Sequence, residues 1–330
     1  MLKRKIEQTL SEWKNTANRK PLIVKGCRQC GKTFSVLDFA HKNYKNVVYL
    51  NFFENPEYAS VFAGSLEIDH IVMMLTALLG SAAVFEAGKT VLVLDEIQDC
   101  PEARTALKFF RIDGRYDVIG TGSLLGVKGY GKEPKSIPVG FETVVDMYPL
   151  DFEEFLWANG ITDGIIDMLK KSMDTESPVP EPLHNRMRQL LLQYTVVGGM
   201  PDAVQTFVDT KQMDEVLKIQ RDIVRSYEDD MVKYAERKDK SKIKECFQSI
   251  PKQLSKENKK FQYSVVKKGS NASKYAGSLQ WIEDAGIISR CYNLSSTELP
   301  LDGNAEKDCF KVYMRDCGLF VSMLEDGTQY

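Results

Sequence analysis

The eight residues from Gly26 to Thr33, GCRQCGKT, constrain the fold of this chain more than any other segment. They match the pattern GxxxxGKS/T at every fixed position. The apolar run Leu22-Ile23-Val24 precedes them, and Lys32 to Leu37 reads as the start of a helix, which is the strand–loop–helix context that the pattern requires. Such a loop turns its backbone amides toward phosphate oxygens. The sequence therefore predicts a phosphate-binding loop for a nucleoside triphosphate.

Each position of the loop has an expected role. Gly26 and Gly31 let the backbone turn its N–H groups onto phosphate oxygens. Lys32 is expected to reach the β- and γ-phosphates, and the Thr33 hydroxyl to ligate Mg²⁺. The positions between the glycines are expected to contact the nucleotide as part of the same loop: Cys27, Arg28, Gln29 and Cys30.

A second motif, VLVLDE at residues 91–96, favours hydrolysis over passive binding. Four apolar residues predict a buried parallel strand that brings its carboxyl end to the site. Asp95 is expected to hold Mg²⁺ through water, and Glu96 to orient or deprotonate the attacking water. The alternative is a core strand followed by a solvated acidic turn, but the intact loop favours the catalytic interpretation.

A third strand is predicted at residues 116–120, followed by Thr121-Gly122-Ser123. A hydroxyl at this strand end, with Ser123 as the candidate, could reach the γ-phosphate; Thr-Gly-Ser is also ordinary turn chemistry. The chain has no NKxD-like motif of the kind that reads guanine. The expected ligands are therefore ATP and Mg²⁺.

Several segments together resemble a known family. RKPLIVKGCRQCGKT, DEIQ at 95–98, TGS at 121–123, YPLDFEEFL at 148–156, GGMP at 198–201 and FKVYMRDCGLF at 310–320 are similar to bacterial and archaeal AAA-type ATPases. The branch in question carries a winged-helix region and then a nuclease-like domain of unknown function. The resemblance covers nearly the whole chain.

The resemblance implies an α/β fold with a parallel sheet of strand order 5-1-4-3-2, flanked by helices and followed by a helical lid. It implies roles for Lys32, Thr33, Asp95, Glu96 and Ser123 at the phosphates. It also places Pro201 in the lid against the adenine. At Gly140-Phe141, where many AAA proteins have an arginine finger, no arginine is found. No acidic and lysine constellation of the nuclease-like kind follows residue 320, so the sequence is expected either to be truncated before that domain or to be that of a shortened member.

Composition is that of a globular protein with two or three domains. Of the residues, 43% are apolar and 27% charged, enough for a sizeable core without crosslinks. Neither a signal peptide nor an apolar run of the ~20 residues that a membrane span needs is found, so a cytoplasmic protein without membrane contact is expected. Seven scattered cysteines argue against a disulfide framework. Cys27 and Cys30 form a C-x-x-C, but a redox or metal role would compete with the triphosphate for the same backbone.

Three domains are predicted: an ATP-binding domain at 1–170, a helical lid at 171–240 and a winged-helix domain at 241–330. A first helix is expected from Leu2 to about Ala17, and strands separated by helices indicate a parallel sheet. Asp151 and Glu154 form a capping-box pattern. Prolines mark a linker at 171–184, and lid helices are expected at 185–196 and 201–236.

The segment 233–274 is basic, with thirteen Lys or Arg and four Asp or Glu, whereas the whole chain has 44 against 46. The residues from Val265 to Ile288 read as a recognition helix, a turn at Gly286 and a strand into a wing. Basic helices near such a unit neutralise nucleic-acid phosphates. A solvated lysine-rich surface is the alternative.

These observations predict an AAA-type ATPase that hydrolyses ATP with Mg²⁺ and couples nucleotide state to a partner through the lid and winged helix. The partner is expected to be DNA bound by 233–274, a second copy of the chain, or another protein. The alternative is a nucleotide-gated protein-binding switch with little or no turnover.

Overall fold

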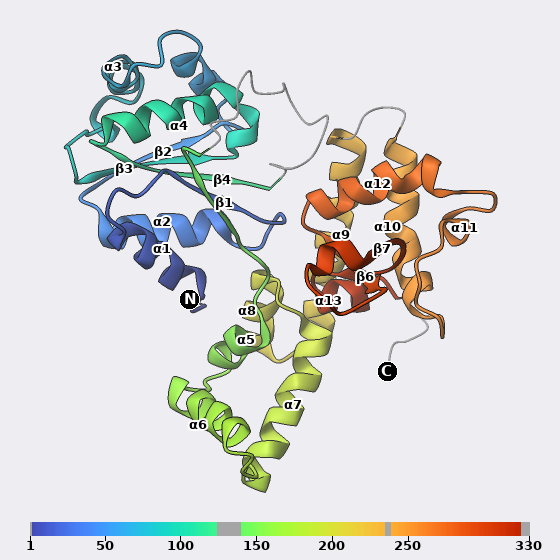
Figure 1. The fold of residues 1–330 in the computed structure, drawn as a ribbon. Coiled ribbons are helices and arrows are strands. Elements are labelled where there is room, and N and C mark those ends of the chain that lie inside the picture. Colours follow the sequence, from blue (N-terminus) through green and yellow to red (C-terminus); the bar gives the residue numbers. More distant parts are fainter. Residues whose placement is uncertain (1, 124–139, 235–238, 325–330) are drawn as a thin grey trace. The chain divides into compact units, whose positions relative to one another are not determined.

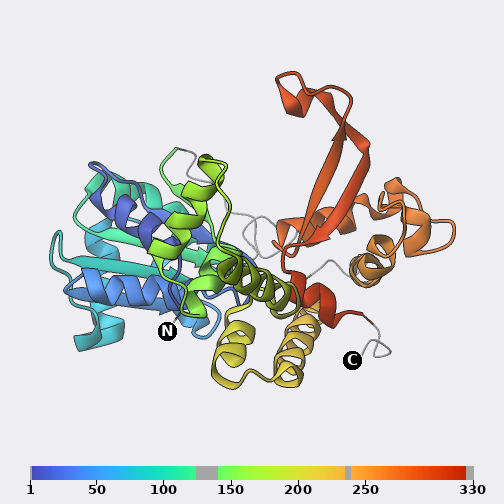
Figure 2. The ribbon, with the colours of Figure 1, turned by 90° about the horizontal axis from the view of Figure 1, so that it is seen from below.

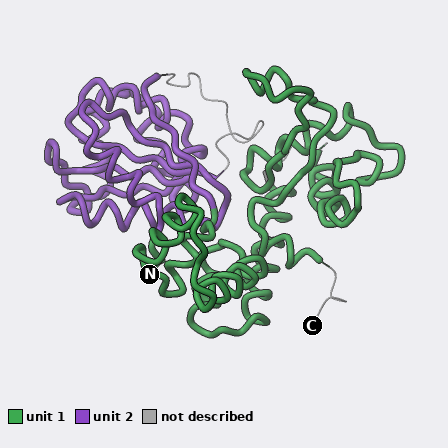
Figure 3. The backbone as a smooth tube through the Cα atoms, turned by 60° about the horizontal axis from the view of Figure 1, so that its bottom comes forward, with its two compact units in different colours: residues 1–3, 149–330 green, residues 4–148 purple. Residues whose placement is uncertain are grey.

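The computed structural model describes residues 2–123, 140–234 and 239–324. The chain forms two compact units, coloured separately in Figure 3. One comprises Arg4–Tyr148, here called the loop unit. The other comprises Met1–Lys3 with Pro149–Tyr330, here called the helical unit. The division into three predicted domains at 170 and 240 stays a prediction.

The loop unit alternates strands and helices. In chain order its main elements are α1 (Ile6–Asn15), β1 (Leu22–Lys25), α2 (Lys32–Asn43), β2 (Asn46–Asn51), α3 (Ile68–Leu79), β3 (Thr90–Asp95), α4 (Pro101–Asp113), β4 (Asp117–Gly122) and β5 (Thr143–Asp146). Short 3-10 helices lie at Pro56–Phe62, Gly80–Ala82 and Ile97–Asp99.

The five strands form one parallel sheet of order β2-β3-β4-β1-β5. Counted from the other edge this is 5-1-4-3-2, so the strand order that the resemblance implies is confirmed. Helices α1 and α2 cover one face of the sheet, and α3 and α4 cover the other (Figure 1). The predicted first helix is found, shortened at both ends, and it buries Ile6, Leu10 and Trp13.

The burial of β3 follows from its interior position in the sheet. All six of its residues are buried, as expected for a strand that has a neighbour on each side and helices on both faces. Phe52 and Phe62 pack edge-to-face in this core with ring centroids 5.8 Å apart. Asn51 of β2 lies opposite Asp95 of β3 in the parallel register. The polar residues that end these strands therefore lie side by side at the carboxyl ends of the strands.

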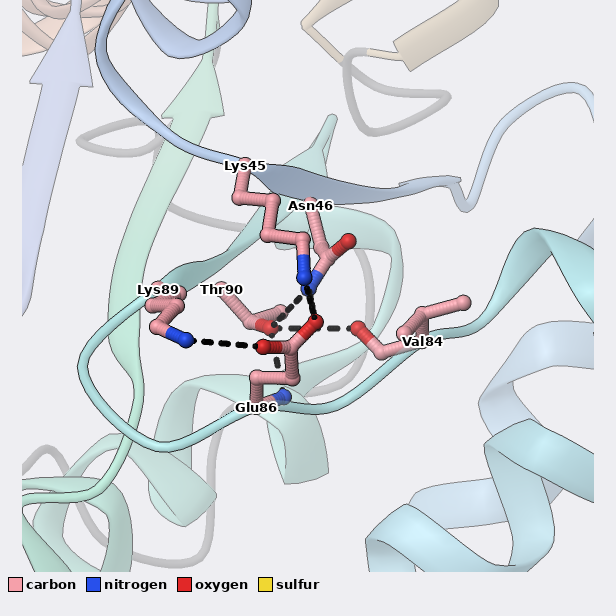
Figure 4. A network of polar contacts seen from close by, with 6 residues as sticks. All are labelled: Lys45, Asn46, Val84, Glu86, Lys89 and Thr90. Atoms are coloured by element: carbon pink, nitrogen blue, oxygen red, sulfur yellow. Dashed lines mark hydrogen bonds and ion pairs between the residues drawn. The ribbon is translucent and has the colours of Figure 1, made fainter.

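A polar network around Glu86 lies at the other end of the strands, where β2 and β3 begin (Figure 4). Its carboxylate accepts hydrogen bonds from Lys45 at 2.6 Å, Asn46 at 3.3 Å and Lys89 at 3.1 Å. The hydrogen bond from Lys45, with those from Asn46 and Lys89, lowers the pKa of Glu86 from 4.5 to about 2. The network joins the segments that lead into β2 and β3.

The helical unit begins with α5 (Phe152–Ala158), α6 (Asp163–Asp174), α7 (Glu181–Val197), α8 (Pro201–Thr210) and α9 (Met213–Tyr234). The capping box before α5 is confirmed: Asp151 accepts from the Glu154 backbone N–H, and the Glu154 carboxylate accepts from the Asp151 N–H.

Two predictions in this region were wrong. The linker is only 175–180, because α6 extends to Asp174 and α7 begins at Glu181. Pro182 lies in the first turn of α7, where a helix does not need the missing N–H. The predicted helix 201–236 is two helices, since Lys211 adopts a left-handed conformation with φ of 58° and ends α8.

The rest of the helical unit contains α10 (Lys240–Leu254), α11 (Tyr263–Val266), α12 (Ala272–Asp284), β6 (Ile288–Leu294), a 3-10 helix (Leu301–Asn304), β7 (Ala305–Met314) and α13 (Cys317–Ser322). A turn at Gly286, with φ of 76°, and a strand after it are found where predicted. Strands β6 and β7 pair antiparallel as a hairpin whose length is visible in Figure 2. Within the described residues, no helix combines the length and apolar composition of a membrane span.

Candidate functional site

The segment Gly26–Thr33 joins β1 to α2, as the motif predicts. Two of its residues adopt left-handed backbone conformations, Gln29 with φ of 63° and Gly31 with φ of 90°. A Cβ atom on Gly26 would lie 2.1 Å from the Met147 carbonyl oxygen. Gly26 is therefore required because the chain leaving β5 crosses directly against the loop.

The Lys32 side chain lies inside the loop and is 6% exposed. Its Nζ donates hydrogen bonds to the carbonyl oxygens of Gly26 at 3.0 Å and Cys27 at 2.8 Å. The ammonium group is thus surrounded by the backbone that would hold a phosphate. Among the other loop residues, Arg28 has its guanidinium 5.8 Å from the Phe53 ring centroid, and Gln29 is exposed.

Asp95, at the end of β3, is 3% exposed. Its two carboxylate oxygens each lie 3.1 Å from Oγ1 of Thr33, which donates to them. The structure therefore brings together the two residues predicted to hold a metal. One hydroxyl and one carboxylate are hard oxygen ligands of the kind Mg²⁺ takes alongside phosphate oxygens and water, so the pair fits that ion. No cluster of three or more His, Cys, Asp or Glu suited to a metal occurs among the residues described.

Three further side chains donate to the Asp95 carboxylate, and the sequence analysis assigned this role to none of them. Tyr49 donates its hydroxyl at 2.8 Å, Asn51 its amide at 3.3 Å, and Thr121 its hydroxyl. Burial raises the pKa of the Tyr49 phenol, and its bond to the Asp95 carboxylate raises it further, so the phenol remains a neutral donor. The sequence signal that could have identified these donors was a polar residue at the end of an otherwise apolar strand.

Glu96 follows β3 in a left-handed conformation with φ of 51°, which turns its side chain out of the strand. Its Oε2 accepts hydrogen bonds from the Gln98 amide and from Oγ of Ser123, the latter at 3.3 Å. Ser123 comes directly after β4, which runs on through Gly122. The structure thus brings Glu96 and Ser123 together, whereas Gln98 was not predicted to take part.

Arg4 is a further residue at the loop that the sequence analysis did not identify. It is buried, and its guanidinium donates to the carbonyl oxygens of Cys30 at 2.9 Å and Tyr148 at 2.7 Å. The residue precedes α1, far from the loop in sequence. Arg4 therefore joins the phosphate loop to the end of the loop unit through two backbone carbonyl groups.

Pro201 lies in the helical unit, as the first residue of α8. The turn before it is tightly packed: a Cβ atom on Gly199 would lie 2.0 Å from the Leu150 carbonyl oxygen. This turn is accordingly well defined. The predicted contact between Pro201 and an adenine base stays a prediction.

Comparison with known proteins agrees with this geometry. A family model described as "AAA domain" matches residues 18–156, and one described as "Domain of unknown function (DUF8612)" matches residues 188–330. No curated protein matches the chain.

Solved structures with a similar fold include the Walker-type ATPase PABY2304 of Pyrococcus abyssi. It has a TM-score of 0.55 and 13% identity over 98% of this chain and 96% of that one. The RuvB Holliday junction branch migration motor of Thermotoga maritima has a TM-score of 0.38 and 14% identity over 88% and 90% of the two chains. The Aeropyrum pernix Orc1 protein, solved in complex with DNA, has a TM-score of 0.34 and 14% identity over 99% and 93%.

The similarity to the Pyrococcus abyssi ATPase concerns the fold, and the match to the AAA family model identifies the kind of domain. Both agree with the parallel sheet and with the strand–loop–helix at Gly26–Thr33. The chain therefore carries an AAA domain with the fold of the P-loop ATPases, joined to a C-terminal domain of unknown function.

Proposed function

We propose that this chain binds ATP with Mg²⁺ at Gly26–Thr33 and hydrolyses it to ADP and phosphate. The observation that carries the proposal is the pair of hydrogen bonds from Thr33 to Asp95, because this hydroxyl and carboxylate come from separate elements and meet beside the loop. The AAA fold supports nucleotide binding.

Each residue of the site has a separate proposed role in hydrolysis. Lys32 and the loop amides stabilise the negative charge that develops on the transferred phosphoryl group. Thr33 would hold Mg²⁺ directly and Asp95 through water; the ion, when bound, neutralises charge on the β- and γ-phosphates. Glu96 orients the attacking water and accepts its proton. The new bond joins the water oxygen to the γ-phosphorus, and the bond to the β,γ-bridging oxygen breaks.

Ser123 is the proposed contact between the γ-phosphate and Glu96. Its hydroxyl donates to Glu96 in the structure, and a γ-phosphate oxygen would be a competing acceptor. If the Ser123 hydroxyl donated to the γ-phosphate instead, the Glu96 carboxylate would be available to accept a hydrogen bond from the attacking water. Adenine is the proposed base because the chain lacks a guanine-reading motif, with Pro201 as its contact in the helical unit.

We also propose that DNA is the partner and that α10–α12 with the β6–β7 hairpin form a winged helix. Helix α12 exposes Ser273, Lys274 and Gln280, and Gly277 on the same helix leaves open space around its Cα. Lys268, just before α12, is also exposed. This surface combines positive charge with small residues that allow a phosphate backbone to approach closely.

Not every lysine of the basic segment is equally available to phosphates. Lys242, Lys244 and Lys267 form ion pairs with Asp239, Glu228 and Glu245. Residues 235–238, which belong to the same segment, lie outside the described residues. Lys268 and Lys274 are therefore the residues to test first.

The experiment measures ATP binding by calorimetry with and without Mg²⁺, and hydrolysis with and without duplex DNA. We expect binding that needs Mg²⁺ and turnover that DNA stimulates. Binding without measurable turnover under either condition would favour the alternative, a nucleotide-gated protein-binding switch. Failure to bind ATP would refute the proposal.

A further inference from the structure

Two cysteines, Cys27 and Cys30, lie within the phosphate loop and are separated by two residues. Cys27 is 4% exposed and Cys30 is not exposed at all, and neither takes part in a disulfide bond. Arg28 and Gln29 form a turn between them, helped by the left-handed conformation of Gln29. The Cys30 thiol donates to the Met147 carbonyl oxygen at 3.6 Å.

The turn meets the geometric requirement for a disulfide bond. The first and last residues of a tight turn have Cα atoms less than about 7 Å apart. A disulfide needs a Cα separation of about 4.4–6.8 Å. Two buried thiols at the ends of such a turn can be joined by rotation about their side-chain and backbone torsions.

The surroundings of Cys30 also favour the reactive form of the sulfur. The hydrogen bond from Cys27 lowers the pKa of the Cys30 thiol from 9.0 to about 6, with help from the positive charges of Lys32 and Arg4. Burial opposes this shift at Cys30, and burial raises the pKa of Cys100 and Cys246 to about 12. The thiolate is the nucleophile in thiol oxidation, so Cys30 is the expected nucleophile of the pair.

We propose that Cys27 and Cys30 form a reversible disulfide that closes the phosphate loop to nucleotide. With hydrogen peroxide as oxidant, the Cys30 thiolate attacks one peroxide oxygen to give a sulfenic acid and hydroxide. The Cys27 sulfur then attacks the Cys30 sulfur and displaces that oxygen as water. In sum, two thiols and one peroxide give one disulfide and two waters.

The disulfide would obstruct binding because its residues are those that hold the loop. The Cys27 carbonyl accepts from Lys32, and the Cys30 carbonyl accepts from Arg4. The S–S bond fixes a Cβ separation of about 3.8 Å and a dihedral near ±90°, which the backbone between the two residues must accommodate. The amides of the same residues would then no longer point together at a phosphate.

Nucleotide and oxidation are then linked in both directions. If the disulfide weakens ATP binding by some factor, bound ATP must disfavour the disulfide by the same factor. Bound ATP should therefore protect the thiols. This inference rests on the proposed function for its effect on ATP, but formation of the bond itself does not.

The test has two separate readouts. Reduced protein is treated with hydrogen peroxide with and without ATP and Mg²⁺, and a Cys27–Cys30 crosslink is sought by peptide mass spectrometry. ATP affinity is then measured by calorimetry before oxidation, after it, and after reduction with dithiothreitol. We expect a loop crosslink that ATP suppresses, a loss of affinity of at least tenfold, and recovery on reduction.

Variants identify the sulfurs responsible. C30S is compared with itself before and after peroxide and should show no change in affinity. C27S should form no crosslink, and with no partner thiol its Cys30 sulfenic acid should oxidise further to sulfinic acid, which dithiothreitol does not reverse. C291S, which removes an exposed thiol on β6, should respond as the parent does.

The outcomes separate this inference from the proposed function. A crosslink that leaves ATP affinity unchanged, or no crosslink in peroxide, overturns the inference while ATP binding by reduced protein still supports the proposed function. A reduced protein that never binds ATP contradicts the proposed function, and the crosslink alone would then show the chemistry without its consequence for nucleotide.

Discussion

The Asp316 carboxylate accepts a hydrogen bond from the backbone N–H of Gly199 at 2.6 Å, although the two are 117 residues apart in sequence. The other carboxylate oxygen accepts from the Leu319 N–H at 2.8 Å and so caps α13. Gly198, with φ of 70°, has no room for a side chain because a Cβ would lie 2.4 Å from that same oxygen. One buried side chain near the end of the chain thus fixes the turn before Pro201.

Replacing Asp316 by alanine should destabilise the helical unit. The N–H groups of Gly199 and Leu319 would lose their acceptor inside the protein, at about 1–3 kcal/mol for each unsatisfied group. Chemical denaturation measures the change. D302N, which neutralises an exposed carboxylate in the 3-10 helix between β6 and β7, is the control and should leave stability nearly unchanged. Equal effects of the two variants would contradict a specific role for Asp316.

K32A should weaken ATP binding by about 10- to 150-fold, the equivalent of about 1.5–3 kcal/mol for a hydrogen bond to a charged group. The side chain is the cation already inside the loop. Calorimetry gives the dissociation constant. K42A removes an exposed lysine of the same helix that pairs with Asp38, and it should bind as the parent does. Similar losses in both variants would mean that ATP responds only to net charge.

E96Q should leave ATP affinity intact while slowing turnover at least about 100-fold, the lower range for losing a general base. Glutamine keeps the shape of the side chain but cannot accept the proton from water. Phosphate release under single-turnover conditions measures the chemical step. E57Q, an exposed position in the same unit, serves as control. Hydrolysis by E96Q at the parental rate would show that another group activates water.

E86Q should lower stability at neutral pH by an amount that shrinks in acid. The folded pKa of Glu86, about 2, lies below its ordinary value of 4.5, so the folded state binds fewer protons than the unfolded chain between these values. The contribution of Glu86 is therefore present above pH 4.5 and is lost as pH falls toward 2. Urea denaturation of parent and variant at pH 7, 4 and 3 tests the sign. A gap that widens in acid would contradict this assignment.

Replacing Lys268 and Lys274 by alanine should weaken DNA binding and reduce its dependence on salt. The log of affinity falls with log salt by about 0.9 per neutralised phosphate, so losing two contacts should reduce the slope by about 1.8. K170A/K171A removes equal charge from α6 of the same unit and should change neither quantity. No binding by the parent at ~50 mM salt, where phosphate-driven binding is strong, would point instead to a protein partner.

The phosphate loop and the Asp95 strand were predictable because their signals are local. Glycine spacing specifies the loop, and an uninterrupted apolar run specifies a buried strand. The donors Tyr49 and Asn51 were not, because their place beside Asp95 depends on which strands are neighbours and in what register. The strand order came from the family resemblance rather than from periodicity.

The missed features have physical causes. Lys211 divides α8 from α9 without glycine or proline, so the sequence carries no breaker at that point. The prolines at 178, 180 and 182 indicate a break, but proline in a first helical turn does not exclude a helix. The guanidinium of Arg4 donates to backbone carbonyl oxygens, and a contact with backbone requires no particular partner residue that the sequence could reveal.

The hydrogen bond from Thr33 to Asp95 also bears on how quickly a metal ion could enter the site. A divalent ion takes a hydroxyl through the oxygen lone pairs, while the hydrogen of Thr33 already points at the Asp95 carboxylate. The Thr33 hydroxyl can therefore coordinate an ion and donate to Asp95 at the same time, so its hydrogen bond to Asp95 does not have to break. If Mg²⁺ binds as proposed, neither side chain would have to rearrange first, so entry of the ion would not wait for the protein.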